Sequence, residues 1–88
     1  MNETELYKKA IELWGIESQV GMVIEECSEL ITAICHAQRD RATVIDIAQE
    51  VADVEIMCGQ LREIIGNDIV TQCKKEKLIR LEQRIEKV

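Results

Sequence analysis

Four carboxylates arranged in two pairs are the residues whose spacing most directly predicts chemistry. Glu26 and Glu29 are three residues apart, and Glu50 and Asp53 repeat that spacing further along the chain. On an α-helix, residues three apart are neighbours on one face, about 60° apart around the axis. If two antiparallel helices carry the pairs, all four carboxylates point to one place. The sequence therefore predicts a site for a hard divalent cation, and Mg²⁺ fits best because it prefers oxygen ligands.

The alternative interpretation is an ordinary solvated acidic face, because glutamate is common on exposed helices. Two observations favour the metal site. Each pair is flanked by apolar residues, such as Val23 and Val54, which places it at the edge of a buried face. Neither pair has a Lys or Arg four residues later, although an exposed acidic face usually carries such partners. The absence of a Glu-x-x-His pair argues against a di-iron bundle, and the all-oxygen ligand set disfavours zinc.

The elements that must position these carboxylates are predicted to be helices, because the chain has no Pro and only four Gly. We predict four of them, over about residues 4–14, 17–39, 43–65 and 69–87. Gly15 is expected to end the first helix, Thr43 to cap the third and Gly66 to end it. Asn67 or Asp68 is expected to cap the fourth. The predicted fold is all-α and four-helix bundle-like, with two long antiparallel helices carrying the acidic metal site.

The apolar residues predict how such helices pack. Hydrophobic residues make up 47% of the chain, yet it has no Phe, one Trp and one Tyr. The core is therefore aliphatic, which suits helix-on-helix packing. The 88 residues form one domain at most, and a domain of this size is marginally stable alone. The surplus of apolar surface predicts that the protein is oligomeric.

The net charge and the cysteine content limit the classes of protein to which the chain can belong. The formal net charge of −6 argues against a general nucleic-acid binder, which needs a basic surface. Residues 74–88 depart from this balance, with six basic and three acidic residues. The four cysteines form no C-x-x-C pair, so we expect reduced core residues of a cytoplasmic protein. A polar N-terminal stretch and frequent charges predict neither a secretory leader nor a membrane span.

The motif Glu25-Glu26-x-x-Glu29, followed after twenty residues by Glu50-x-x-Asp53, resembles the signature of the MazG-like, all-alpha NTP pyrophosphatase superfamily. The likeness covers roughly residues 10–85 and is closest to the short, phage-type members. It includes residues before, within and after the acidic motif: Trp14-Gly15, Gln19, Leu30, Ala52-Asp53-Val54 and Lys77-Leu78-x-Arg80-Leu81-x-x-x-Arg84.

The resemblance implies a Mg²⁺-dependent hydrolase, with Mn²⁺ as a substitute, that converts a nucleoside triphosphate to the monophosphate and pyrophosphate. It implies that Glu26, Glu29, Glu50 and Asp53 hold one or more ions. Glu25 is the candidate to orient or deprotonate the attacking water. It also implies a homodimer or homotetramer and a role in nucleotide pool control or house-cleaning. Six further residues are candidates for substrate contacts: Lys74, Lys77, Arg80, Arg84, Gln19 and Trp14.

Purely structural roles for these residues remain alternatives to the functional ones. The basic residues also fit a solvated helix end, where positive charge favours the helix dipole. Trp14, the only Trp, also fits a core or interface anchor. For the whole chain, the alternative is a catalytically silent helical module that binds a partner or senses nucleotides. The sequence predicts neither the base nor the sugar that the site selects.

Overall fold

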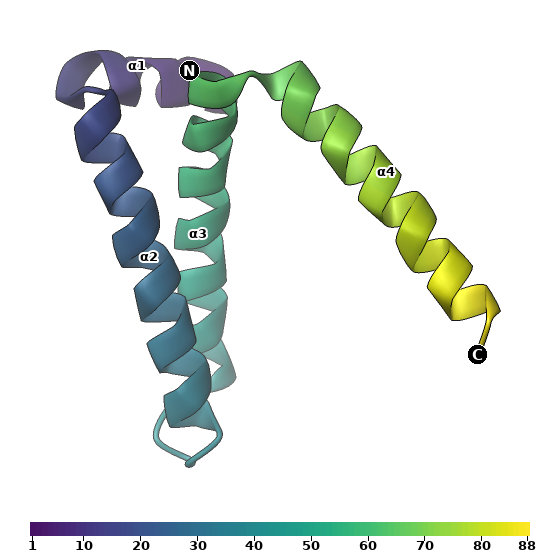
Figure 1. Cartoon of the computed structure of the whole chain (residues 1–88). Coiled ribbons are helices and arrows are strands. Elements are labelled where there is room, and N and C mark those ends of the chain that lie inside the picture. Colours follow the sequence, from purple (N-terminus) through teal and green to yellow (C-terminus); the bar gives the residue numbers. More distant parts are fainter.

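The structure, a computed structural model, describes all 88 residues and consists of four α-helices without a strand. The helices are α1 (Glu3–Trp14), α2 (Ile16–Ala37), α3 (Val44–Ile65) and α4 (Asn67–Glu86). Helices α2 and α3 form an antiparallel hairpin, α1 lies across its open end, and α4 points away from it (Figure 1). The predicted all-α class is confirmed. None of the four helices combines the length and the apolar character that a membrane crossing requires.

Local side-chain chemistry explains where the first three helices begin and end. The Asn2 side chain accepts a hydrogen bond from the Glu5 backbone N–H at 2.9 Å, which caps α1. Gly15 ends α1 with a φ of 88°, a backbone conformation that glycine adopts without strain. Thr43 and Asp46 form a capping box at the start of α3, with backbone-to-side-chain distances of 2.7 and 3.2 Å. The predictions for Gly15 and Thr43 are confirmed.

The start of α4 differs from the prediction. The helix begins at Asn67 itself, directly after Gly66, and no side chain caps it. The prediction that Asn67 or Asp68 caps this helix is therefore wrong. The Asn67 side chain instead accepts from Arg62 Nη1 at 3.0 Å and donates to Glu63 at 3.1 Å. Gly66, with a φ of 126°, turns the chain without any intervening loop, so the next residue is already helical.

The buried core of the chain is very small. Only Ala33, Met57, Gln19 and Gln60 are buried, and each glutamine is 5% exposed. Gln19 Nε2 donates to Gln60 Oε1 at 2.7 Å, and Gln60 Nε2 donates to Met57 Sδ at 3.7 Å. A pair of amides therefore joins α2 to α3 where the hairpin meets α1. Each amide satisfies part of the other's hydrogen-bonding capacity, which a buried polar group requires.

The apolar face predicted for the second helix is only partly covered. Val23 and Leu30 are half-buried between the long helices. Ile24 and Ile31 are 65% and 63% exposed, and Ile34 also faces solvent. The apolar stripe of α2 is thus wider than the contact with α3, and one flank of it has no cover within the chain.

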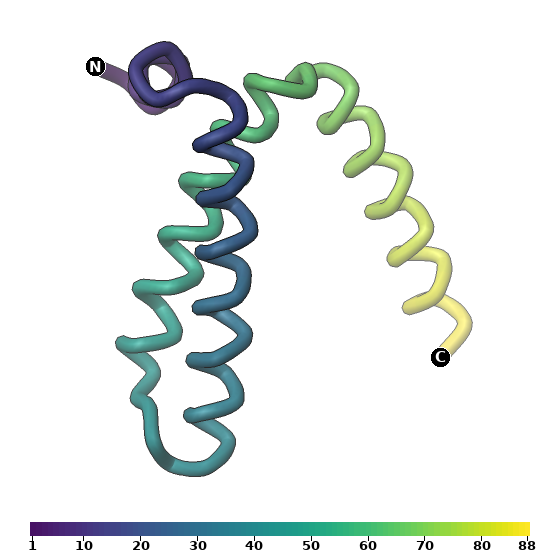
Figure 2. The backbone as a smooth tube through the Cα atoms, turned by 60° about the vertical axis from the view of Figure 1, so that its left-hand side comes forward, coloured from purple at the N-terminus to yellow at the C-terminus, as the bar shows by residue number.

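Helix α4 is an arm rather than a member of a closed bundle. It has no buried residue, and α3 is its only neighbour among the helices. Both views show it diverging from the hairpin along its whole length (Figures 1 and 2). The radius of gyration is 15.8 Å, whereas a compact chain of this length has about 12 Å. Three helices therefore pack together, and the fourth extends from them.

Candidate metal centre

Three of the four predicted carboxylates converge. Glu26 and Glu29 lie one turn apart on α2, and Glu50 lies on the facing side of α3. One carboxylate oxygen from each lies within 4.8 Å of the others. Glu26 and Glu50 are half-buried between the helices, while Glu29 is exposed. We call Glu26, Glu29 and Glu50 the acidic cluster. The antiparallel hairpin thus brings together three of the four carboxylates that the two spacings place at one point.

Asp53, the fourth predicted ligand, lies beside the acidic cluster without joining it. It is exposed, and its carboxylate is outside the set of converging oxygens. Its negative charge nevertheless contributes to raising the pKa of Glu26 and of Glu50. Asp53 is therefore close enough to add to the negative field at the acidic cluster.

The electrostatics of the acidic cluster disfavour its fully ionised form. Loss of hydration is the main cause that raises the pKa of Glu26 from 4.5 to about 7, followed by a hydrogen bond shared with Glu29 and the charge of Glu29. The pKa of Glu50 is raised in the same direction, first by loss of hydration and then by the charges of Glu29 and Asp53. All the charged groups responsible are carboxylates. No cation of the chain relieves this repulsion.

Two oxygens of the acidic cluster lack any partner. Glu26 Oε2 and Glu50 Oε2 are both buried without a hydrogen bond. Unpaired buried polar atoms are rare because they have lost their hydration without compensation. A hard divalent cation would satisfy them and neutralise the carboxylates together, since carboxylate oxygens are the ligands it prefers. The donor set therefore fits Mg²⁺ or Mn²⁺.

A cavity of about 420 Å³ opens next to the acidic cluster, at the loop end of the hairpin. Glu29 and Glu50 line one side of it, and His36 and Arg41 line it as well. Neither His36 nor Arg41 is among the site residues that the sequence predicts. A signal existed for His36, which follows Glu29 by seven residues and so lies two turns along the same face. Arg41 gave no such signal, because loop residues have no periodicity.

The cavity at the acidic cluster thus combines anionic and cationic groups. The Asp46 side chain also lines it, and hydrogen bonds from Thr43 lower the pKa of that carboxyl. The Asp46 carboxylate therefore caps α3 and stays ionised. Arg41 is the only Lys or Arg that lines this cavity, which makes it the positive group in one chain best situated to meet an anionic ligand there.

Glu25, Gln19 and Trp14 lie outside the acidic cluster. Glu25 is exposed on α2 beside Glu26. Gln19 is buried, and its side-chain N–H group already donates to Gln60. Trp14 is 64% exposed at the end of α1 and lines a separate cavity of about 560 Å³ with Leu6. Neither Gln19 nor Trp14 lines the cavity at the acidic cluster.

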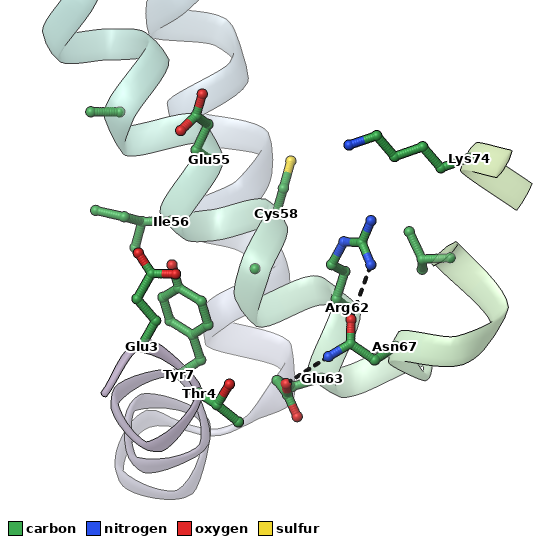
Figure 3. Close-up of a pocket in the computed structure, with 13 residues that line it drawn as sticks. Glu3, Thr4, Tyr7, Glu55, Ile56, Cys58, Arg62, Glu63, Asn67 and Lys74 are labelled. Atoms are coloured by element: carbon green, nitrogen blue, oxygen red, sulfur yellow. Dashed lines mark hydrogen bonds between the residues drawn. The ribbon is translucent and has the colours of Figure 1, made fainter. Parts of the chain in front are cut away.

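The predicted basic residues of the C-terminal segment are all exposed on α4. Lys74 lines a cleft of about 960 Å³ between α1, α3 and α4, and its side chain extends across the cleft towards α3 (Figure 3). Arg62 and Tyr7 line the same cleft. None of Lys74, Lys77, Arg80 and Arg84 lines the cavity at the acidic cluster: one chain alone does not bring the two charged regions together.

No family model, curated protein or solved structure matches this chain. The resemblance to the MazG-like superfamily therefore stays a prediction that rests on the sequence motif. The geometry of the acidic cluster is an independent observation.

Proposed function

We propose that the protein is a divalent-cation-dependent nucleoside triphosphate pyrophosphohydrolase of the MazG-like type. The observation that carries this proposal is the convergence of Glu26, Glu29 and Glu50 with two buried, unpartnered oxygens. A purely structural acidic face would keep these oxygens hydrated. The motif that the sequence shares with the superfamily adds the substrate class and the bond that is cleaved.

Each residue of the site has a defined task in this proposal. Glu26, Glu29 and Glu50 would hold Mg²⁺, and Asp53 would complete the ligand set. The ion, when bound, neutralises phosphate oxygens and supplies a positive centre for the developing charge. Glu25, next to this set on α2, accepts the proton of the attacking water. Arg41 and His36 face the polyphosphate from the loop end of the cavity, where Arg41 donates charge-assisted hydrogen bonds.

The proposal includes self-association as a homodimer or homotetramer. It is supported by the exposed apolar residues of α2 and α4, which a second copy would cover. It also accounts for the basic residues of α4, which do not reach the acidic cluster of their own chain.

The test is release of pyrophosphate from a panel of common and damaged nucleoside triphosphates, with and without Mg²⁺. Glu26→Gln and Glu50→Gln should lower kcat/KM by about 10²-fold or more, because each removes a ligand charge that acts in the transition state. Glu17→Gln is the matched control, since Glu17 lies on α2 but outside the acidic cluster. Full turnover in both cluster variants would overturn the site.

A second pair of variants tests the loop end of the cavity. Arg41→Ala should raise KM for the nucleotide about tenfold, since one charge-assisted contact to phosphate is lost. Arg39→Ala, two residues away and not lining the cavity, should leave KM unchanged. Mg²⁺-dependent thermal stabilisation without hydrolysis of any nucleotide would instead identify a nucleotide-sensing module. If Mg²⁺ does not stabilise the protein and no nucleotide is hydrolysed, the remaining interpretation is a helical interaction module.

A further inference from the structure

The solvent-accessible surface area of the chain exceeds that of a compact folded monomer of the same size. The accessible surface is 6995 Å², whereas a compact monomer of this mass exposes about 5,300 Å². The surplus is about 1,700 Å² per chain, and a stable interface needs only about 800 Å² from each partner. The chain therefore carries enough uncovered surface for a large interface with another molecule.

Much of this surface lies in two regular stripes. The first, the α2 stripe, has apolar residues spaced four, three, four and three apart: Val20, Ile24, Cys27, Ile31 and Ile34. The second, the α4 stripe, has them spaced three and four apart: Leu78, Leu81 and Ile85. All these residues except Cys27 are exposed, and Ile31 and Ile85 are each 63% exposed. Alternation of three and four is the spacing of a helix seam that packs against another helix.

The charges around the stripes indicate which helices meet. Helix α2 contains four glutamates and neither Lys nor Arg, whereas residues 74–88 hold six basic and three acidic residues. Pairing α4 with α4 of a second copy would bring two basic segments together, which costs energy. Pairing α4 with α2 instead brings together two segments of opposite net charge, each of which carries an apolar stripe. The α2 stripe is therefore the complementary surface.

The position of the α2 stripe keeps the acidic cluster accessible. Ile31 is two residues from Glu29, and Ile24 is two residues from Glu26, so each is turned about 200° from its acidic neighbour around the axis. A helix that packs on the α2 stripe therefore lies on the opposite flank of α2 from Glu29. The same interface can then exist whether or not the cluster binds a cation.

We propose that α4 of one copy packs on the α2 stripe of a second copy, and that the two copies exchange these arms. The inference specifies the self-association proposed above and does not depend on the hydrolysis. It explains why α4 diverges from its own hairpin with no residue buried (Figure 2). It also means that the basic residues of each arm are contributed to the body of the partner.

The experiment is an isotope-filtered nuclear Overhauser measurement on an equimolar mixture of ¹³C-labelled and unlabelled full-length chains. The expected result is a set of contacts between copies that join methyl groups of Leu81 and Ile85 to those of Ile24 and Ile31. Contacts between copies that join only α4 to α4 would overturn the proposal. Contacts between α4 and α2 that arise only within one uniformly labelled chain would mean that the arm closes on its own hairpin, and would also overturn it.

Two matched variants test the same interface through the molar mass of the assembly and the dimer dissociation constant. Ile85→Glu should raise the dimer dissociation constant about tenfold or more, because it puts a charge in the apolar seam. Ile79→Glu, on the same helix but turned about 120° from Ile85, should leave the constant within about threefold. Circular dichroism checks that both variants stay helical. Equal effects of the two variants, or a wild-type chain of monomer mass at high concentration, would contradict the exchange without bearing on hydrolysis.

Discussion

At the scale of single residues, the acidic cluster combines two features that ordinary surface glutamates lack. Its two half-buried members, Glu26 and Glu50, have each lost hydration and gained carboxylate neighbours. With a pKa of about 7, Glu26 is partly protonated at neutral pH. Protons would therefore compete with the cation that is proposed to bind at this site.

This competition predicts how the stability of the metal-free protein varies with pH. The pKa of Glu26 is about 7 in the folded chain, against an ordinary value of 4.5. Between these values the folded state binds more protons than the unfolded state, so the free energy of unfolding falls as pH rises through this window. Glu50 acts in the same direction. The melting temperature in chelator should therefore be several degrees lower at pH 8 than at pH 5.5.

Glu26→Gln tests the assignment of this pH dependence, because the amide cannot ionise. The variant should melt at a higher temperature than the wild type at pH 8 in chelator, and its stability should change less between pH 5.5 and 8. It should also gain less stability from added Mg²⁺. An identical pH profile in variant and wild type would show that Glu26 is not the group that titrates.

At the scale of the elements, the sequence predicted the helices well because their ends depend on local chemistry. Gly15 and the capping pair of Thr43 and Asp46 act on the residues beside them, and their spacing is visible in the chain. The start of α4 was missed because Gly66 makes the turn alone, so Asn67 was free to bond Arg62 and Glu63. The acidic cluster was predictable for the same local reason, since i, i+3 spacing fixes a face.

The sequence predicted that the two long helices lie antiparallel, but it could not predict which residues of the loop and of the other helices lie beside them. The basic residues of α4 were expected to face the acidic cluster, but their positions depend on the angle between α3 and α4. Arg41 and His36 were passed over because only the closing of the hairpin brings them beside Glu29 and Glu50. The contact between Gln19 and Gln60 could not be predicted, because the two residues lie on different helices.

The contact between Gln19 and Gln60 gives a prediction for the α2–α3 hairpin. Gln60→Leu should destabilise the chain by about 1–3 kcal/mol, since it leaves the buried Gln19 amide without its acceptor. The double replacement of both glutamines by Leu should cost less than the sum of the single replacements, because no orphaned amide remains. Urea unfolding of the four chains measures this coupling.

The same set of variants separates the structural role of Gln19 from the substrate role predicted from the sequence. If the amide pair is structural, Gln19→Leu and Gln60→Leu lose similar stability and neither changes KM for a nucleotide. Additive free energies, together with a raised KM in Gln19→Leu alone, would favour contact between Gln19 and the base.

At the scale of the whole molecule, the proposed self-association bears directly on the stability of the fold. With only four buried residues, the single chain has little apolar burial to oppose the entropy of ordering its backbone. A large part of the stabilising burial is therefore expected between copies. For such a protein, the stability of the folded state depends on the concentration of its subunits.

This dependence gives a prediction that needs no variant. The melting temperature should rise steadily when the protein concentration is raised about a hundredfold, because in the proposed assembly the folded chains are associated and the unfolded chains are not. Calorimetry together with sedimentation at matched concentrations measures it. A melting temperature independent of concentration, with a monomer mass throughout, would mean that the isolated chain suffices for its own stability.

The junction between α3 and α4 has a consequence for the symmetry of any assembly that this chain builds. The direction of α4 is set by the turn at Gly66 and by Arg62 Nη1, which bonds both Asn67 and Thr71, the latter at 2.9 Å. When each of two copies receives the arm of the other, the assembly closes as a symmetric dimer. An arm at another angle engages a third copy and propagates as an open filament. The Arg62 guanidinium and Gly66, which set the angle of α4, would therefore determine whether the copies form a closed dimer or an open filament.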